Sequence, residues 1–246
     1  MATASRRTKI WVWVIVLALF AGATWVAVST IRASVQPLGV VADPFPDEDT
    51  RPEGSEEARG PVNFLVYGTV DATPQTLSIF HLADGRRRID ILNFPQNSSD
   101  ISDFSDVAGT VQEVETLTAA RMEHVMMWDL AFLAELEAGP VSPDELASNP
   151  EIYDAETVWT TVLQEALDIR DPGQLNTLAS SLTPYVDADA QLNTGRITDL
   201  ARSIRHVSPD NIGSCTLPES FDVVAQDALQ RYFEDGAPRW CAELFD

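Results

Sequence analysis

Hydrophobic and polar positions divide the chain into one uniform apolar run, a polar stretch and a long segment with regular periodicity. Residues 10–31 carry no charge, and 22 helical residues at ~1.5 Å each span roughly 33 Å, enough for the ~30 Å core of a bilayer. Residues 32–60 are acidic and rich in proline, which is typical of a flexible stalk. Periodicity begins at residue 61. We therefore expect a cytoplasmic N-terminus at 1–9, a transmembrane helix at 10–31, a stalk at 32–60 and an exported domain at 61–246.

Strands dominate the first half of the expected domain. Residues 62–68, VNFLVYG, form a continuous apolar run that ends at a glycine, as expected of a strand buried on both faces. Residues 76–82 and 87–94 flank the turn sequence at 83–86, which predicts an antiparallel hairpin. The pattern then predicts a helix at 108–119, a strand at 122–128 and a helix at 130–137.

Helical periodicity is stronger in the second half. It predicts helices over 154–168, from Asp171-Pro172 onward and over 195–206, followed by a short strand at 213–217. A final amphipathic helix is expected at 219–234, with Phe221, Val224, Leu229 and Phe233 as its core residues. Strands followed by helices interleaved with strands favour an α/β fold, with a mixed central β-sheet and helices on both faces.

Charges around the apolar run set its orientation. Arg6, Arg7 and Lys9 precede it, whereas most charges that follow are acidic. The positive-inside bias places the N-terminus in the cytoplasm, in a single-pass protein of the cell membrane whose domain is extracytoplasmic. A cleaved signal peptide is the alternative, although the run is longer than the usual apolar region of about 7 to 15 residues. Both interpretations export the domain.

The exported part is strongly acidic. All 38 acidic residues follow the anchor, whereas four of the 16 basic residues (Arg6, Arg7, Lys9 and Arg32) precede or flank it, so the exported part has 12 basic and 38 acidic residues and a net charge of −26. Such a surface repels nucleic acids, whose phosphates require clustered Lys and Arg, and we expect no nucleic-acid partner.

Two cysteines occur in the chain, Cys215 and Cys241, 26 positions apart. In an oxidising compartment this pair suggests one disulfide that holds the C-terminal tail. The alternative is two unpaired buried thiols. Metal binding by two cysteines without a nearby histidine is disfavoured, because zinc sites need four ligands, or three and a water.

Several segments, in their order, resemble the LytR-CpsA-Psr (LCP) domain of bacterial cell-envelope assembly. They are NFLVYGT and TLSIFHLADGRRRIDILNFPQNS, then VETLTAARMEHVMMWDLAFLAELE, and finally the stretch from residue 171 to 218. The likeness covers residues 62–235. It implies transfer of a phospho-linked glycopolymer from a polyprenyl-pyrophosphate carrier to a wall acceptor. That chemistry needs carboxylates that hold a divalent metal and arginines that bind the pyrophosphate.

The residues at the family's functional positions are mostly replaced. The aspartate before the second strand's threonine falls on Gln75, and Asp71 matches the neighbouring aspartate only one residue out of register. The arginine after the hairpin's proline falls on Gln96, and the aspartate beside it on Asn97. Asp154 is retained where the family's later arginine cluster begins, but no Arg or Lys occurs between residues 121 and 170.

These replacements leave three hypotheses. The first, which we favour, is a noncatalytic module that binds a polyprenyl-phosphate lipid, as part of a lipid-linked glycopolymer precursor, or an envelope protein. The second is an active phosphotransferase whose ligands come from other residues, such as Asp71, Asp100 or Asp103; only this hypothesis requires Mg²⁺, and otherwise no cofactor is expected. The third is a structural scaffold subunit.

Other candidate residues favour structural roles. His81, His124 and His206 lack the spacing of metal ligands, and Ser98 and Ser99 have no base nearby in the sequence. Arg86, Arg87 and Arg88 belong to the expected hairpin turn, where a solvated surface is the simpler interpretation.

Overall fold

The computed structural model describes residues 39–54, 60–83, 85, 87–95, 98–101, 104–130, 183–192, 196, 200, 211–235 and 244. The expected transmembrane helix at 10–31 and the helix at 154–168 lie outside these residues, as do nearly all of the helix at 130–137 and most of the helices expected after residue 171. Within the described part of the chain, no helix is long and apolar enough to cross a membrane.

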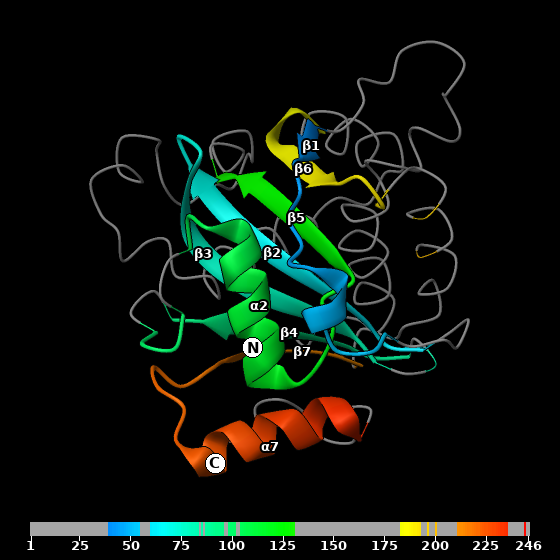
Figure 1. Ribbon diagram of the computed structural model, residues 1–246, viewed down its shortest axis with the longest axis vertical. Helices are drawn as coiled ribbons and strands as arrows, with labels where there is room; N and C mark the ends of the chain where they lie inside the picture. The colour runs from blue at the N-terminus through cyan, green and yellow to red at the C-terminus, as the bar shows by residue number, and fades with distance from the viewer. Residues whose placement is uncertain are drawn as a thin grey trace, which may run out of the picture.

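The described residues form a seven-stranded mixed sheet with the strand order β1-β6-β5-β2-β3-β4-β7. The strands are β1 (Gly39–Val41), β2 (Val62–Val70), β3 (Thr73–Leu82), β4 (Ile89–Phe94), β5 (His124–Asp129), β6 (Val186–Asp189) and β7 (Ile212–Thr216). Strands β2, β3 and β4 form an antiparallel meander, β5 is parallel to β2, and β7 is parallel to β4 (Figure 1). The mixed sheet is the predicted one, and β2 to β5 and β7 lie close to their expected positions.

These strand directions give the sheet two distinct edges. The carboxyl ends of β2, β4, β5 and β7 meet at one edge, which we call the carboxyl edge. The amino ends of the same strands meet at the other, the amino edge. The hairpin turn between β2 and β3 lies on the carboxyl edge, and the turn between β3 and β4 lies on the amino edge.

The two described α-helices, α2 (Val107–Thr118) and α7 (Val223–Glu234), pack on one face of the sheet (Figure 1). Each helix begins at an aspartate: Asp106 accepts a hydrogen bond from the backbone N–H of Gly109 at 3.0 Å, and Asp222 caps α7 in the same way. The prediction of helices on both faces is therefore confirmed for one face, while the second depends on parts of the chain outside the described residues. Val224 is not a core residue as predicted, since it is 75% exposed in the first turn of α7.

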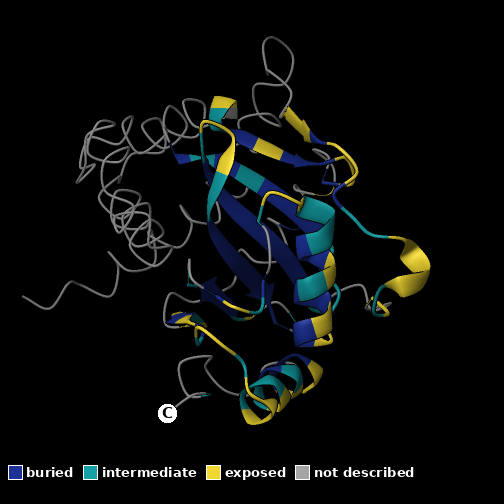
Figure 2. Cartoon of the chain, turned by 60° about the vertical axis from the view of Figure 1, so that its left-hand side comes forward, coloured by how far each residue is buried: buried dark blue, intermediate teal, exposed yellow. Residues whose placement is uncertain are grey.

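Both faces of the central strands are buried, which explains their continuous apolar sequences (Figure 2). The helix-covered face presents Leu65, Tyr67 and Ile79, which pack against Val111 and Leu229 of the helices. The alternate positions on the other face are buried as well; they include Phe64, Val66, Phe80, Ile91, Met126 and Trp128.

Residues 39–54, part of the stalk expected at 32–60, contact the domain; the rest of that stalk, except residue 60, lies outside the described residues. Residues 39–41 form β1, which adds to the sheet parallel to β6, and a 3-10 helix, η1, spans Glu48–Thr50. The Arg51 side chain is 2% exposed and forms an ion pair of 2.7 Å with Glu115 of α2. Its guanidinium also stacks over the Phe45 ring, 4.4 Å from the ring centroid. The composition of residues 39–54 did not predict that they contact the domain, because one buried arginine, Arg51, anchors an otherwise polar segment.

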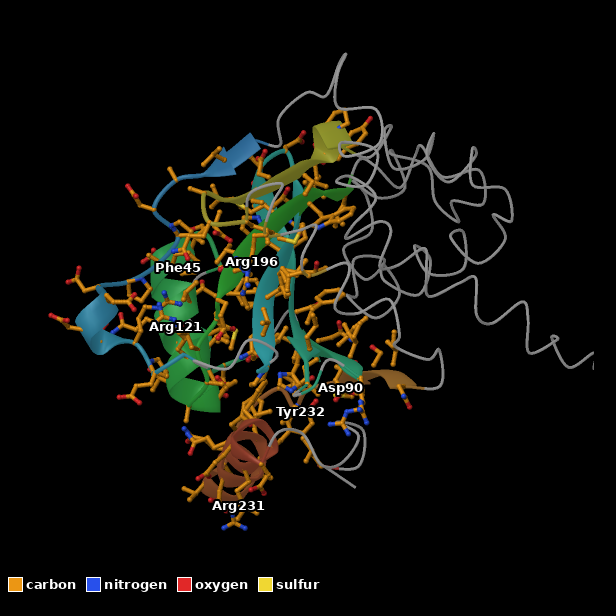
Figure 3. The ribbon with its side chains drawn as sticks, turned by 90° about the vertical axis from the view of Figure 1, so that its right-hand side faces the viewer. Phe45, Asp90, Arg121, Arg196, Arg231 and Tyr232 are labelled. Atoms are coloured by element: carbon orange, nitrogen blue, oxygen red, sulfur yellow. The ribbon has the colours of Figure 1, made fainter. Side chains whose placement is uncertain are left out.

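The amino edge contains a buried polar network beside α7. The Tyr232 hydroxyl of α7 donates a hydrogen bond to the Asp90 carboxylate, which also pairs with Arg88 at 3.1 Å (Figure 3). Burial raises the pKa of Asp90. His81, which pairs with Asp90 across the β3–β4 ladder, has its Nδ1 2.6 Å from the Asn63 side-chain oxygen. Burial lowers the pKa of His81 to about 3, so the ring is neutral.

Candidate functional site

The carboxyl edge is the first place to look for a ligand site. In open α/β sheets, ligands bind outside the carboxyl ends of the strands, because these ends direct loops and unpaired backbone groups into one crevice. Here four strands end together, Asp71 lies in the turn between β2 and β3, and Gln75 lies near the start of β3.

A close backbone approach shapes the centre of this edge. The β2–β3 register shifts between Gly68 and Thr69, and the N–H of Gly68 donates a hydrogen bond to the Thr76 hydroxyl at 3.1 Å. A side chain at Gly68 would collide with that hydroxyl and would approach the Leu130 Cδ2 to 2.9 Å, so glycine is required. The register shift bends β2 locally, so it changes the direction of the residues that follow Gly68 at the end of the sheet.

The turn between β2 and β3 consists of Asp71 and Ala72, both in the left-handed region with φ of 49° and 61°. Two positive φ values are typical of the type I′ turn, which joins two strands through two residues. Asp71 is exposed and its carboxylate projects from a short, defined turn. Gln75 is half-buried, and its amide lies 3.5 Å from the Thr73 carbonyl oxygen in the same strand.

A second carboxylate reaches this edge from β5. Asp129 is the last residue of β5 and pairs with Thr69 across the parallel β2–β5 ladder. The Thr69 hydroxyl donates to the Trp128 carbonyl oxygen at 3.2 Å, which fixes the two strand ends together. Asp129 was not predicted as a site residue. The sequence shows only an acid directly after the strand expected at 122–128, which does not by itself place Asp129 near Asp71.

The connection after β4 supplies hydroxyls and a third carboxylate. Ser98 is 8% exposed, and its hydroxyl has no hydrogen-bond partner among the described residues. The N–H of Ser99 donates to the Glu219 carbonyl oxygen at 2.9 Å, and Asp100 accepts from the N–H of Phe221 at 2.9 Å. Asp100 thus joins this connection to the start of α7, a structural role. Gln96 lies outside the described residues, as do Asn97 and Asp103.

A polar ladder lies directly beneath the edge, on the face opposite α2 and α7. The Ser78 hydroxyl donates to the Asn93 side-chain oxygen at 2.9 Å, and the Asn93 amide donates to the Ser214 hydroxyl at 2.9 Å. The same amide contacts the Cys215 carbonyl oxygen at 3.1 Å. These bonds connect β3, β4 and β7, so they hold the strand ends in register and satisfy buried polar groups.

Described cations are concentrated away from the carboxyl edge. Arg51 and Arg121 pair with Glu115 and Glu48, and Arg88 pairs with Asp90 on the amino edge. The Arg196 side chain donates to the His124 Nε2 at 3.4 Å, at the amino end of β5 (Figure 3). Residues of the described ranges therefore bring no guanidinium to Asp71 and Gln75. The same ranges contain no group of three or more His, Cys, Asp or Glu side chains able to hold a metal.

The remaining sequence predictions have mixed outcomes. His81 and His124 are buried and hydrogen-bonded, His124 Nδ1 to Asp189 at 3.2 Å, as expected of structural residues. Cys215 is 8% exposed on β7, but Cys241 lies outside the described residues, so their pairing stays a prediction. Asp154 also lies outside.

Comparison with known proteins supports the arrangement of the fold. No family model and no curated protein sequence matches the chain. Among solved structures, a "LytR-Csp2A-Psr enzyme from Actinomyces oris" has a TM-score of 0.54 at 15% identity over 80% of this chain and 96% of that chain. TagV from B. subtilis has a TM-score of 0.53 at 10% identity, over 74% of this chain and 98% of that one.

A third solved structure, "TagT bound to LI-WTA", has a TM-score of 0.51 at 10% identity and covers 82% of this chain and 100% of that chain. Identities this low indicate a shared fold and leave the chemistry to the residues of each chain. The described domain therefore has an LCP-like fold, the one that the sequence resemblance implied.

Proposed function

We propose that this protein is a membrane-anchored, extracytoplasmic LCP-like protein of bacterial cell-envelope assembly. Its domain acts as a noncatalytic module that binds a lipid-linked glycopolymer precursor or an envelope partner. The apolar run at 10–31 supports the anchor, and the LCP-like fold supports the envelope role.

The observation that carries the noncatalytic proposal is the composition of the carboxyl edge. Gln75 stands where the family's aspartate is expected, and a neutral amide cannot contribute the charge that holds a divalent metal. Arg51, Arg88 and Arg121 are paired elsewhere in the fold. Loss of one preorganised donor typically costs about 3 to 4 kcal/mol of transition-state stabilisation, so loss of several leaves little of the reaction.

Turnover on a polyprenyl pyrophosphate is the direct test. We expect the purified ectodomain, residues 39–246, to release no phosphate with Mg²⁺ under conditions in which an active phosphotransferase of the LCP family does. Starting at residue 39 keeps the contact between Arg51 and Glu115. Mg²⁺-dependent turnover that disappears in Asp71→Ala would overturn the noncatalytic proposal.

An active transferase is the second candidate, because two carboxylates, Asp71 and Asp129, come from neighbouring parallel strands at the same edge. Carboxylates in this position are the ligands that Mg²⁺ prefers. This candidate predicts turnover in the wild-type ectodomain and its loss in both Asp71→Ala and Asp129→Ala. Asp187→Ala, an exposed acid of β6, is a matched control that should retain activity.

Lipid binding separates a binding module from a scaffold. A polyprenyl phosphate should raise the melting temperature of the ectodomain in proportion to its affinity and concentration. The polyprenol without phosphate is the control for nonspecific detergent-like effects. A shift with the phosphate that exceeds the shift with the alcohol supports binding, and no shift at saturating lipid favours the scaffold.

A further inference from the structure

The path of β1 fixes where the N-terminal segment leaves the sheet. Gly39 pairs with Asp187 of β6, which pairs with Met127 of β5, and Met127 pairs with Tyr67 of β2. Strand β1 is parallel to β6 and therefore antiparallel to β5 and β2. Because β1 runs away from the carboxyl edge, its first residue, Gly39, is the end of β1 that lies nearer that edge.

The distance from Gly39 to the carboxyl edge is short. Tyr67 lies on the same level of the ladder as Gly39, and β2 ends three residues later at Val70. Three extended residues span about 10 Å at ~3.3 Å each. The amino edge is farther from Gly39. Leu77 pairs with Tyr67 and so lies on the same level as Gly39, and β3 continues from Leu77 for five more residues toward the amino edge. These five residues span about 17 Å.

The connection to the apolar run is short as well. Only residues 32–38 separate that run from Gly39. Seven residues have a maximum reach of about 25 Å when fully extended, and a typical end-to-end distance of roughly 15 Å as a flexible chain. The headgroup layer takes about 6 Å of this reach.

These lengths distinguish two orientations of the domain. With the carboxyl edge toward the membrane, the connection must cover about 16 Å, close to its typical length. With the amino edge toward the membrane, it must run back along the sheet and cover about 23 Å, nearly its full extension. An extended chain has lost most of its conformational freedom, so the second orientation is disfavoured.

We propose that the carboxyl edge, with Asp71 and Asp129, faces the membrane at close range. The inference rests on the anchor in the proposed function and makes that function more specific. The site is presented to a ligand embedded in the leaflet, such as a lipid headgroup, rather than to one that diffuses in from the distal side.

Energy transfer between the domain and labelled lipids tests the orientation. One fluorophore is placed at Asp71→Cys, on the carboxyl edge, or at Arg87→Cys, on the amino edge; both positions are exposed turn residues. Ten residues of β3 separate the two turns by about 33 Å. The full chain is reconstituted into phosphatidylcholine vesicles, whose neutral surface avoids charge repulsion, with an acceptor on a fraction of the headgroups. The unsubstituted chain measures background labelling at native cysteines.

We expect clearly more efficient transfer from position 71 than from position 87. Insertion of 20 Gly/Ser residues between 38 and 39 should reduce this difference, since the longer connection frees the domain to rotate. Equal transfer from both positions, or more from position 87, overturns the orientation. Flotation with the vesicles is measured separately: a chain that does not float refutes the anchor itself, and with it the inference.

Discussion

The contact between Arg51 and Glu115 should decide whether residues 39–54 stay on the domain. Both side chains are nearly inaccessible, at 2% and 3% exposure. The Arg51 guanidinium donates to Glu115 Oε1 and Oε2 at 2.7 to 3.2 Å, and to the Met122 carbonyl oxygen at 2.6 Å. Arg51→Met keeps much of the side-chain volume but removes every one of these bonds, and it leaves a buried carboxylate without its cation.

The expected loss in the free energy of unfolding is about 3 to 4 kcal/mol at pH 7. Removing one partner of a buried pair typically costs about 3 to 5 kcal/mol.

Urea denaturation of the ectodomain measures this loss, and limited proteolysis reports release of residues 39–54. The double variant Arg51→Met/Glu115→Leu should recover most of the stability, because it leaves no buried charge. Arg231→Met is the control: Arg231 pairs with Asp227 on the exposed face of α7 at 2.7 Å, and such surface pairs contribute about 0 to 1 kcal/mol.

Two results would refute the reasoning. One is a loss in Arg51→Met no larger than in Arg231→Met. The other is a double variant as unstable as the single one, which would mean that packing of the arginine stem, rather than an uncompensated charge, accounts for the effect.

Three further predictions concern the turn, the cysteines and a buried histidine. Ala72→Gly should raise the free energy of unfolding by about 1 kcal/mol, since it relieves the positive φ of 61°, whereas Ala228→Gly within α7 should lower it by a similar amount; urea denaturation measures both. Exported protein under denaturing, non-reducing conditions should show no free thiol, and two titratable thiols would refute the pairing of Cys215 with Cys241. Because burial lowers the pKa of His81 to about 3, the folded state binds fewer protons than the unfolded state below pH 6.5. Stability from this residue is thus complete above pH 6.5 and falls by about 2 kcal/mol at pH 5, and His81→Gln should reduce that fall; an unchanged pH profile of unfolding would contradict it.

The central strands, the turn after β3 and helix α2 were predictable, because a single requirement, burial or turn geometry, determines the residues of each. Strand β2 is apolar throughout since both of its faces are buried, and the turn after β3 contains Gly85, whose φ of 67° suits glycine. Helix α2 was predicted within one residue of its observed ends. In each case the local pattern agrees with the tertiary environment.

Strands β1 and β6, at one side of the sheet, were not predictable, since their stability comes from contacts distant in sequence. Strand β6 has the sequence Val-Asp-Ala-Asp, which is unlike a strand. Its Asp189 is nevertheless buried, because the carboxylate accepts hydrogen bonds from the N–H groups of Val125, Gln191 and Leu192. The Asp189 carboxylate satisfies these backbone donors, and no periodic pattern in the sequence indicates that it does.

The candidate site also contains one residue that the sequence points to and one that it does not. That Gln75 replaces the family's aspartate is a prediction from the sequence resemblance of the neighbouring strands. Asp129 could not be predicted, since its relation to Asp71 depends on the parallel pairing of β5 with β2. Which carboxylates converge is a property of strand order, and local patterns of apolar and polar residues do not specify strand order.

The pairing of β1 with β6 also sets an order of folding. Residue 39 precedes its partner, residue 187, by nearly 150 positions, so β1 cannot pair until most of the chain has been made. The contacts of Glu48 and Arg51 with Arg121 and Glu115 become available much earlier, once the first half of the domain has emerged. They close a shorter loop at lower entropic cost. The N-terminal segment can thus dock first through its arginine pair and add β1 to the sheet once β6 is present, which limits the time that the edge of β6 stays exposed to other chains.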